Sequence, residues 1–192
     1  MSKPTLVLFV LAGAALIGFA VAAMVERTTH HETTEIGSVA ASPQSAPLDW
    51  HEWQGPRGER LGFGVERFQV LTHGWRARIS IANESKVAFG LDRAQREFGL
   101  MLFTSCRHRE LDLRNREQAL PTTRPALVYK PALPQILEPR TTWSGTISAP
   151  GALVARSCMR VVFGTFDPIG KAPDTFPTHL IWITDHAYRL RA

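Results

Sequence analysis

Residues 6–24 form an apolar stretch without a single charged side chain. As a helix with a rise of about 1.5 Å per residue, it would be about 28 Å long, close to the roughly 30 Å of a bilayer's hydrocarbon core. Lys3 is the only basic residue before this stretch, and Glu26 follows it. The sequence therefore predicts a single transmembrane anchor within residues 1–25, with a cytoplasmic N-terminus and an extracytoplasmic C-terminal part.

A cleavable signal peptide is the alternative interpretation. Signal peptides carry an apolar segment of about 7–15 residues before a small-residue cleavage site, and residues 20–23 (Ala-Val-Ala-Ala) resemble such a site. The apolar run is longer than such a segment, and no cysteine is placed for a lipoprotein anchor, so the uncleaved anchor is favoured. Small residues recur at every fourth position of the helix, which indicates a face that packs against another membrane helix. They are Ala14, Gly18 and Ala22.

The polar segment that follows the anchor is expected to be a tether. Residues 26–49 are rich in Ser, Thr and Pro and show neither a helical nor a strand period. Such a composition buries too little apolar surface to offset the entropy of ordering, which predicts a flexible linker. Residues 50–192 are long enough to form one exported domain with a core of its own.

The clearest element of the exported domain is a strand that covers residues 75–82. Apolar and polar side chains alternate there with a period of two, which is typical of an antiparallel strand with one buried face. A short apolar run at residues 87–91 follows the turn at residues 83–85, and together they predict a hairpin. The expected inward side chains are Trp75, Ala77, Ile79 and Ile81.

The remaining pattern is also that of short strands. Apolar runs occur at residues 98–104, 141–148, 153–166 and 180–184, and turns rich in Gly and Pro separate them. Five prolines in residues 121–139 predict an extended crossover, because proline cannot donate a ladder hydrogen bond. The charged segment between the first two of these runs predicts a solvated loop or short helix. The fold class predicted is all-β, a single antiparallel β-sandwich of the immunoglobulin-like type.

Part of this pattern resembles a known group of proteins. Residues 142–148 (Thr-Trp-Ser-Gly-Thr-Ile-Ser), the turn at residues 149–151 and the run at residues 160–164 resemble the later strands of bacterial membrane-anchored immunoglobulin-like domains. The resemblance implies an immunoglobulin-like β-sandwich. Because the module usually mediates binding or assembly in such proteins, it also implies a role without catalysis.

The charge of the chain indicates which partners it favours. The sequence has 22 Lys and Arg against 17 Asp and Glu, a net charge of +5, and only four of the basic residues are Lys. The planar guanidinium of Arg suits contacts with phosphate and carboxylate groups. The charge favours an anionic surface such as lipid headgroups or a wall polymer, and it is too small and too scattered to indicate nucleic acid.

The two cysteines leave a disulfide and two free thiols as alternatives. An even number of cysteines in an exported domain favours a bridge between Cys106 and Cys158. The apolar neighbours of Cys158 alternate toward the core, which places Cys158 on the outer face beside Arg156 and Arg160. An unbridged Cys158 in that setting would have a lowered thiol pKa.

No catalytic pattern is complete. Residues 104–107 superficially resemble the nucleophile strand of sortases, which are membrane-tethered transpeptidases, but no suitable His precedes Cys106 and too much chain follows it. The serine-hydrolase elbow is missing, and the seven His residues lack metal-ligand spacing. No catalytic residue, metal ligand or cofactor is predicted. Trp50 and Trp53 are the candidates for contact with a partner or a membrane interface.

These observations predict a membrane-anchored extracytoplasmic binding or assembly module, such as an accessory subunit with a protein partner in the membrane or envelope. A binding domain for an anionic cell-surface ligand (a lipid headgroup or a wall polymer) is the alternative, and a sortase-like thiol enzyme is third. A contiguous exposed Arg face would favour the anionic ligand. An apolar patch at Trp50 and Trp53 would favour a protein partner. The oligomeric state is not predicted.

Overall fold

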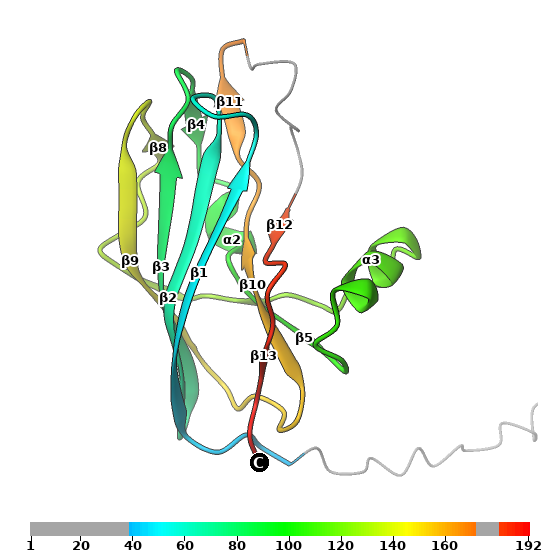
Figure 1. Ribbon diagram of the computed structural model, residues 1–192. Helices are drawn as coiled ribbons and strands as arrows, with labels where there is room; N and C mark the ends of the chain where they lie inside the picture. The colour runs from blue at the N-terminus through cyan, green and yellow to red at the C-terminus, as the bar shows by residue number, and fades with distance from the viewer. Residues whose placement is uncertain (1–38, 172–180) are drawn as a thin grey trace, which may run out of the picture. The chain divides into compact units, whose positions relative to one another are not determined.

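The computed structural model describes residues 39–171 and 181–192, which fold mainly into antiparallel strands (Figure 1). The predicted all-β class is confirmed. Among these residues, no helix is long and apolar enough to cross a membrane. The predicted anchor lies outside the described residues. So does its predicted packing face, which comprises Ala14, Gly18 and Ala22.

The longest strands form a five-stranded sheet, referred to below as the first sheet, in the order β1-β2-β3-β9-β7. Along β3 the buried and exposed residues alternate as predicted, with Trp75 and Ile79 inside. The domain begins earlier than expected, because Ala46 of β1 is already buried, so the expected boundary between linker and domain at residue 50 falls inside a strand. The strands are β1 (Gln44–Gln54), β2 (Leu61–Leu71), β3 (Gly74–Asn83), β9 (Thr142–Pro150) and β7 (Val128–Lys130).

A second sheet packs against the first and has β10 (Cys158–Phe163) in its middle. All six residues of β10 are buried, because its two faces contribute to two different apolar clusters. One cluster is the main core, and the other includes Leu111 of α3 (His108–Arg116), the short helix that formed in the charged segment. The neighbouring strands are β5 (Gly99–Phe103), β6 (Arg124–Pro125), β12 (Trp182–Ile183) and β13 (Tyr188–Arg189).

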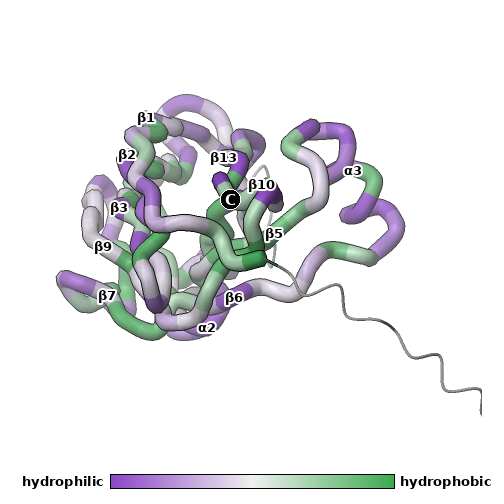
Figure 2. The backbone as a smooth tube through the Cα atoms, turned by 90° about the horizontal axis from the view of Figure 1, so that it is seen from below, coloured by the Kyte–Doolittle hydropathy of each residue, from purple (hydrophilic) through white to green (hydrophobic). Residues whose placement is uncertain are grey.

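The expected exposure of Cys158 and Arg160 is therefore wrong. Both side chains have no exposed surface. They point away from the main core, as the alternation indicated, but α3 and the C-terminal segment cover that side of the strand. Figure 2 shows mostly hydrophobic residues along β5 and mostly hydrophilic residues along α3.

The expected hairpin at residues 87–91 is also wrong. The short strand there, β4 (Ala88–Gly90), pairs with β8 (Ile136–Leu137) and β11 (Asp167–Ile169) in a third sheet, and not with β3. The buried Asn83 side chain redirects the chain, since its amide donates to the carbonyls of Val87, Leu137 and Glu138 at 2.8, 3.2 and 3.0 Å. A side chain that bonds to nearby carbonyls in this way competes with continued strand pairing.

The proline-rich crossover runs past all three sheets. β6 pairs with β5 of the second sheet, β7 pairs with β9 of the first, and β8 pairs with β4 of the third. Each contact is only two or three residues long. The predicted extended crossover is confirmed. A short helix, α2 (Ala94–Glu97), connects β4 to β5.

Tyr129, in the middle of β7, provides a test of this packing. Burial raises the pKa of Tyr129 to about 12. The neutral phenol is thus favoured in the folded state, and its contribution to stability is complete below about pH 10, the pKa of an unperturbed tyrosine, and is lost as the pH rises toward 12. We expect an ultraviolet titration to show one of the two tyrosines ionising late, and Tyr129→Phe to remove that step. A late step that survives the substitution would contradict the packing.

Candidate functional site: an arginine-bearing sheet face

Three arginines lie on the outer face of the first sheet. Arg67 belongs to β2, and Arg76 and Arg78 belong to β3. All three side chains are exposed, while their neighbours Phe68 and Ala77 are fully buried. The period of two along a strand thus places the arginines on the face opposite the core.

The pairing of the strands brings these arginines together. Arg67 lies directly opposite Arg78, and Gln69 lies directly opposite Arg76. On the other side of β3, Thr146 of β9 is opposite Arg78, and Lys130 of β7 is opposite Thr146. Like charges directly opposite each other on neighbouring strands destabilise a sheet. The placement of Arg67 and Arg78 therefore has an energetic cost that an anion bound between them would remove.

Groups of the protein offset only part of this cost. A β-bulge between Val65 and Arg67 displaces Glu66, whose Oε2 lies 2.6 Å from Nε of Arg78. Both side chains of this ion pair are well exposed, so it contributes on the order of 0–1 kcal/mol. Nε of Arg76 donates to the Gln69 amide oxygen at 2.5 Å. Within the described part of the chain, Arg67 has no ion-pair partner.

A shallow hollow opens between these side chains. Its volume is about 150 Å³, which corresponds to several water molecules at roughly 30 Å³ each. Three of the five residues that line it are arginines, and the other two carry an amide and a hydroxyl. Guanidinium forks match the oxygens of phosphate and carboxylate groups. The lining residues are Arg67, Gln69, Arg76, Arg78 and Thr146.

The two tryptophans predicted as a partner contact do not share a surface. They are three residues apart on β1, so their side chains point to opposite faces of the strand. Trp50 faces inward, packs against the core and stacks on His186 with ring centroids 5.5 Å apart. Trp53 faces outward with 42% of its surface exposed, and the Arg60 guanidinium lies 3.7 Å above its ring.

Between the two tryptophans, Glu52 holds the C-terminal segment. Its side chain is buried and accepts hydrogen bonds from Nε1 of Trp182 at 3.2 Å and from the backbone N–H of Asp185 at 2.9 Å. The same carboxylate lies 2.9 Å from Nδ1 of His186. A buried carboxylate with this many donors is a structural clamp, and no pattern in the sequence predicted it.

Arg160 holds the same segment from the other sheet. Its guanidinium donates to the carbonyl oxygens of Thr184, at 2.6 Å, and of Asp185. Burial lowers the pKa of Arg160, and the carboxylates of Asp185 and Glu52 act in the opposite direction. Glu52 from the first sheet and Arg160 from the second together fix residues 182–186.

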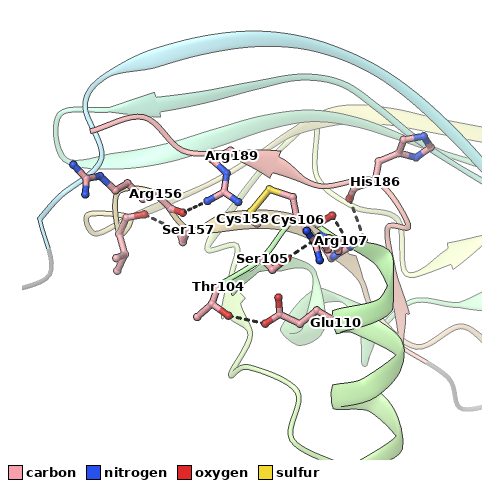
Figure 3. The surroundings of a disulfide bond; sticks show 12 residues. Thr104, Ser105, Cys106, Arg107, Glu110, Arg156, Ser157, Cys158, His186 and Arg189 are labelled. Carbon is pink, nitrogen blue, oxygen red and sulfur yellow. Dashed lines mark hydrogen bonds between the residues drawn. A yellow bond between two sulfur atoms is a disulfide. The ribbon is translucent and has the colours of Figure 1, made fainter.

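The predicted bridge between Cys106 and Cys158 is present next to this clamp (Figure 3). It joins the chain just after β5 to the start of β10, so it links neighbouring strands of one sheet. Both sulfurs are in the bridge, which leaves no free thiol in the chain. A sortase-like mechanism needs a free thiolate, and the bridge removes it.

The described residues contain no group of three or more His, Cys, Asp or Glu side chains that could hold a metal ion. The sequence identified Arg76 and Arg78 as exposed strand residues and the excess of Arg as a signal for anions. It did not identify Arg67 as their neighbour, because that requires the bulged register between β2 and β3. Comparison of the chain with protein-family models, with curated proteins and with solved structures finds no match.

Proposed function

We propose that this chain is a membrane-anchored, extracytoplasmic binding module whose ligand is an anionic component of the cell envelope. The observation that carries the proposal is the set of three arginines around one hollow on an exposed sheet face. An oxyanion in this hollow would accept charge-assisted hydrogen bonds and would relieve the repulsion between Arg67 and Arg78. The anchor in residues 1–25 would keep the module at the membrane.

A protein partner in a membrane complex remains a prediction with less support. The sequence argument placed this contact at Trp50 and Trp53. Since these side chains lie on opposite faces of β1, they do not form a joint apolar patch. A contiguous exposed Arg face is the feature expected for an anionic ligand, and the arginines on the first sheet fit it. An apolar patch at the two tryptophans is the feature expected for a protein partner, and their positions do not fit it.

The immunoglobulin-like class also remains a prediction. The two packed antiparallel sheets support it. The small third sheet and the position of the disulfide differ from the immunoglobulin pattern, in which the bridge crosses from one sheet to the other. The proposed binding role depends on the outer face of the first sheet and not on this classification.

The test uses the full chain in detergent, titrated with long-chain polyphosphate and, separately, with poly-glutamate. We expect wild type to bind at least one of these polyanions. The double variant Arg67→Gln/Arg78→Gln should bind it about a hundredfold more weakly, since it loses two charge-assisted hydrogen bonds worth roughly 1.5 kcal/mol each. The polyanion that binds more tightly would identify the preferred oxyanion.

A matched control distinguishes binding at this site from a general effect of the net charge. The double variant Arg57→Gln/Arg109→Gln removes the same charge from exposed positions away from this face. It should bind within about twofold of wild type in moderate salt, where distant exposed charges are screened. Equal losses in both double variants, or no binding by wild type, would contradict the proposal.

A further inference from the structure

A second surface, which we call the base, lies where the described chain begins. It consists of residues 39–42, 71–73, 150–157 and 189–191. Backbone hydrogen bonds hold these segments together, and the Ala155 N–H donates to the carbonyl of Val39 at 2.8 Å. The N–H groups of Arg156 and Gly151 donate to the carbonyls of Leu190 and His73 at 2.9 and 3.1 Å. The base is at the bottom of Figure 1 and faces the viewer in Figure 2.

The base and its border carry several arginines, and the base segments carry no acidic residues. Arg156, Arg189 and Arg191 are exposed on it, and Arg124 borders it through a 2.9 Å hydrogen bond from Nη1 to the carbonyl of Ala152. Arg189 donates to the carbonyl of Arg156 at 2.8 Å, as Figure 3 shows. The four segments of the base contain no Asp or Glu. The base segments therefore contain no carboxylate that would neutralise these guanidinium groups.

Exposed aliphatic side chains accompany these arginines. Val39 and Leu127 have 68% and 65% of their surface exposed, and Leu71 and Val128 have 40% and 43%. Leu71 and Val128 line one hollow, while Leu127 lines the next hollow together with Arg124. The two hollows share Pro150, so Leu71, Val128 and Leu127 form one apolar strip. Aliphatic and cationic side chains side by side are typical of a surface that rests on lipid headgroups.

The connection of the chain also indicates what covers this surface. Residues 1–38 join the domain at Val39, in the base itself. Only residues 25–38 separate Val39 from the apolar stretch predicted to span the membrane, and at about 3.5 Å per residue they reach at most about 50 Å. Such a short tether keeps the base at a high effective concentration next to the bilayer.

We infer that the base is a membrane-contact surface that binds the headgroups of anionic lipids. This inference goes beyond the proposed ligand site, because it uses other arginines at another part of the domain. Contact by the base leaves the outer face of the first sheet free for a ligand. The domain would thus be held upright on the membrane by charge and not by the tether alone.

The test is hydrogen–deuterium exchange of the full chain reconstituted with phosphatidylcholine alone or with a mixture of phosphatidylcholine and phosphatidylglycerol. We expect the exchange of peptides that cover residues 39–42, 71–73 and 150–157 to slow by a factor of about three or more in the anionic mixture. Contact with the lipid would block the local opening that exchange requires. High salt should remove the slowing. The comparison holds whether or not residues 6–24 span the membrane, since the anionic lipid alone differs.

Two variants with equal charge distinguish this surface from the ligand site. The variant Arg124→Gln/Arg156→Gln/Arg189→Gln should abolish the slowing. The variant with Lys at the same three positions keeps the charge and should keep most of the slowing. That result would exclude the loss of the arginine side chains' packing as the cause. Arg67→Gln/Arg76→Gln/Arg78→Gln should leave the slowing intact. Slowing that is equal in both lipid mixtures, that is absent, or that disappears only in the sheet-face variant would overturn the inference.

Discussion

Replacement of Arg160 by methionine is expected to lower the free energy of unfolding by about 3 kcal/mol, because it leaves buried carbonyl oxygens without a donor while keeping most of the side-chain volume. The Arg160 guanidinium has no exposed surface and donates to the carbonyls of Thr184 and Asp185. With the methionine in place, the turn at residues 184–186 loses these hydrogen bonds to the second sheet. Urea unfolding followed by tryptophan fluorescence would measure the change.

An exposed arginine provides the control for this measurement. Arg109→Met, in α3, makes the same chemical change at a solvent-exposed position. It should alter the free energy of unfolding by no more than about 0.5 kcal/mol. If the two variants lost equal stability, the effect would come from the chemical change itself, and the buried guanidinium would not be the clamp described above.

Removal of the disulfide should have an effect at least as large. Cys106 and Cys158 are 52 positions apart in the sequence, and the chain-entropy model for a closed loop of about this length gives about 4 kcal/mol. The double variant Cys106→Ala/Cys158→Ala should therefore unfold on the order of 10 °C below wild type, at roughly 2–4 °C per kcal/mol for a domain of this size. Calorimetry of the two proteins would measure the shift.

Reduction of wild type serves as the internal comparison, because it opens the same loop without changing the packing at Cys158. Reduced wild type should melt close to the double variant and well below the oxidised protein. A melting temperature unaffected by reduction would mean that the unfolded chain is not constrained by the bridge, and the entropic account would fail for this domain.

Local patterns were sufficient for features that depend on one strand at a time. The alternation of residues 75–82 predicted both the buried face of β3 and the exposure of Arg76 and Arg78, because side chains on a strand alternate with a period of two. The apolar run at residues 98–104 similarly predicted β5. These predictions needed no knowledge of which strands pair.

Features that depend on distant segments were not predictable in the same way. The burial of Arg160 depends on α3 and the C-terminal segment covering a face that alternation alone marks as exposed. The opposition of Arg67 and Arg78 depends on a bulge that shifts the register of β2 against β3. β4 does not pair with β3 because the Asn83 amide donates hydrogen bonds to carbonyls in a segment far along the chain.

The clamp on residues 182–186 has a consequence for the order in which the domain can fold. Glu52 and its partners Trp182 and His186 are 130 and 134 positions apart in the sequence. Contacts this distant form slowly, because the entropy of closing the intervening chain must be lost first. During synthesis, the early hairpins can form while the carboxylate of Glu52 still faces water. The buried core closes on that side only after almost the whole domain has been made.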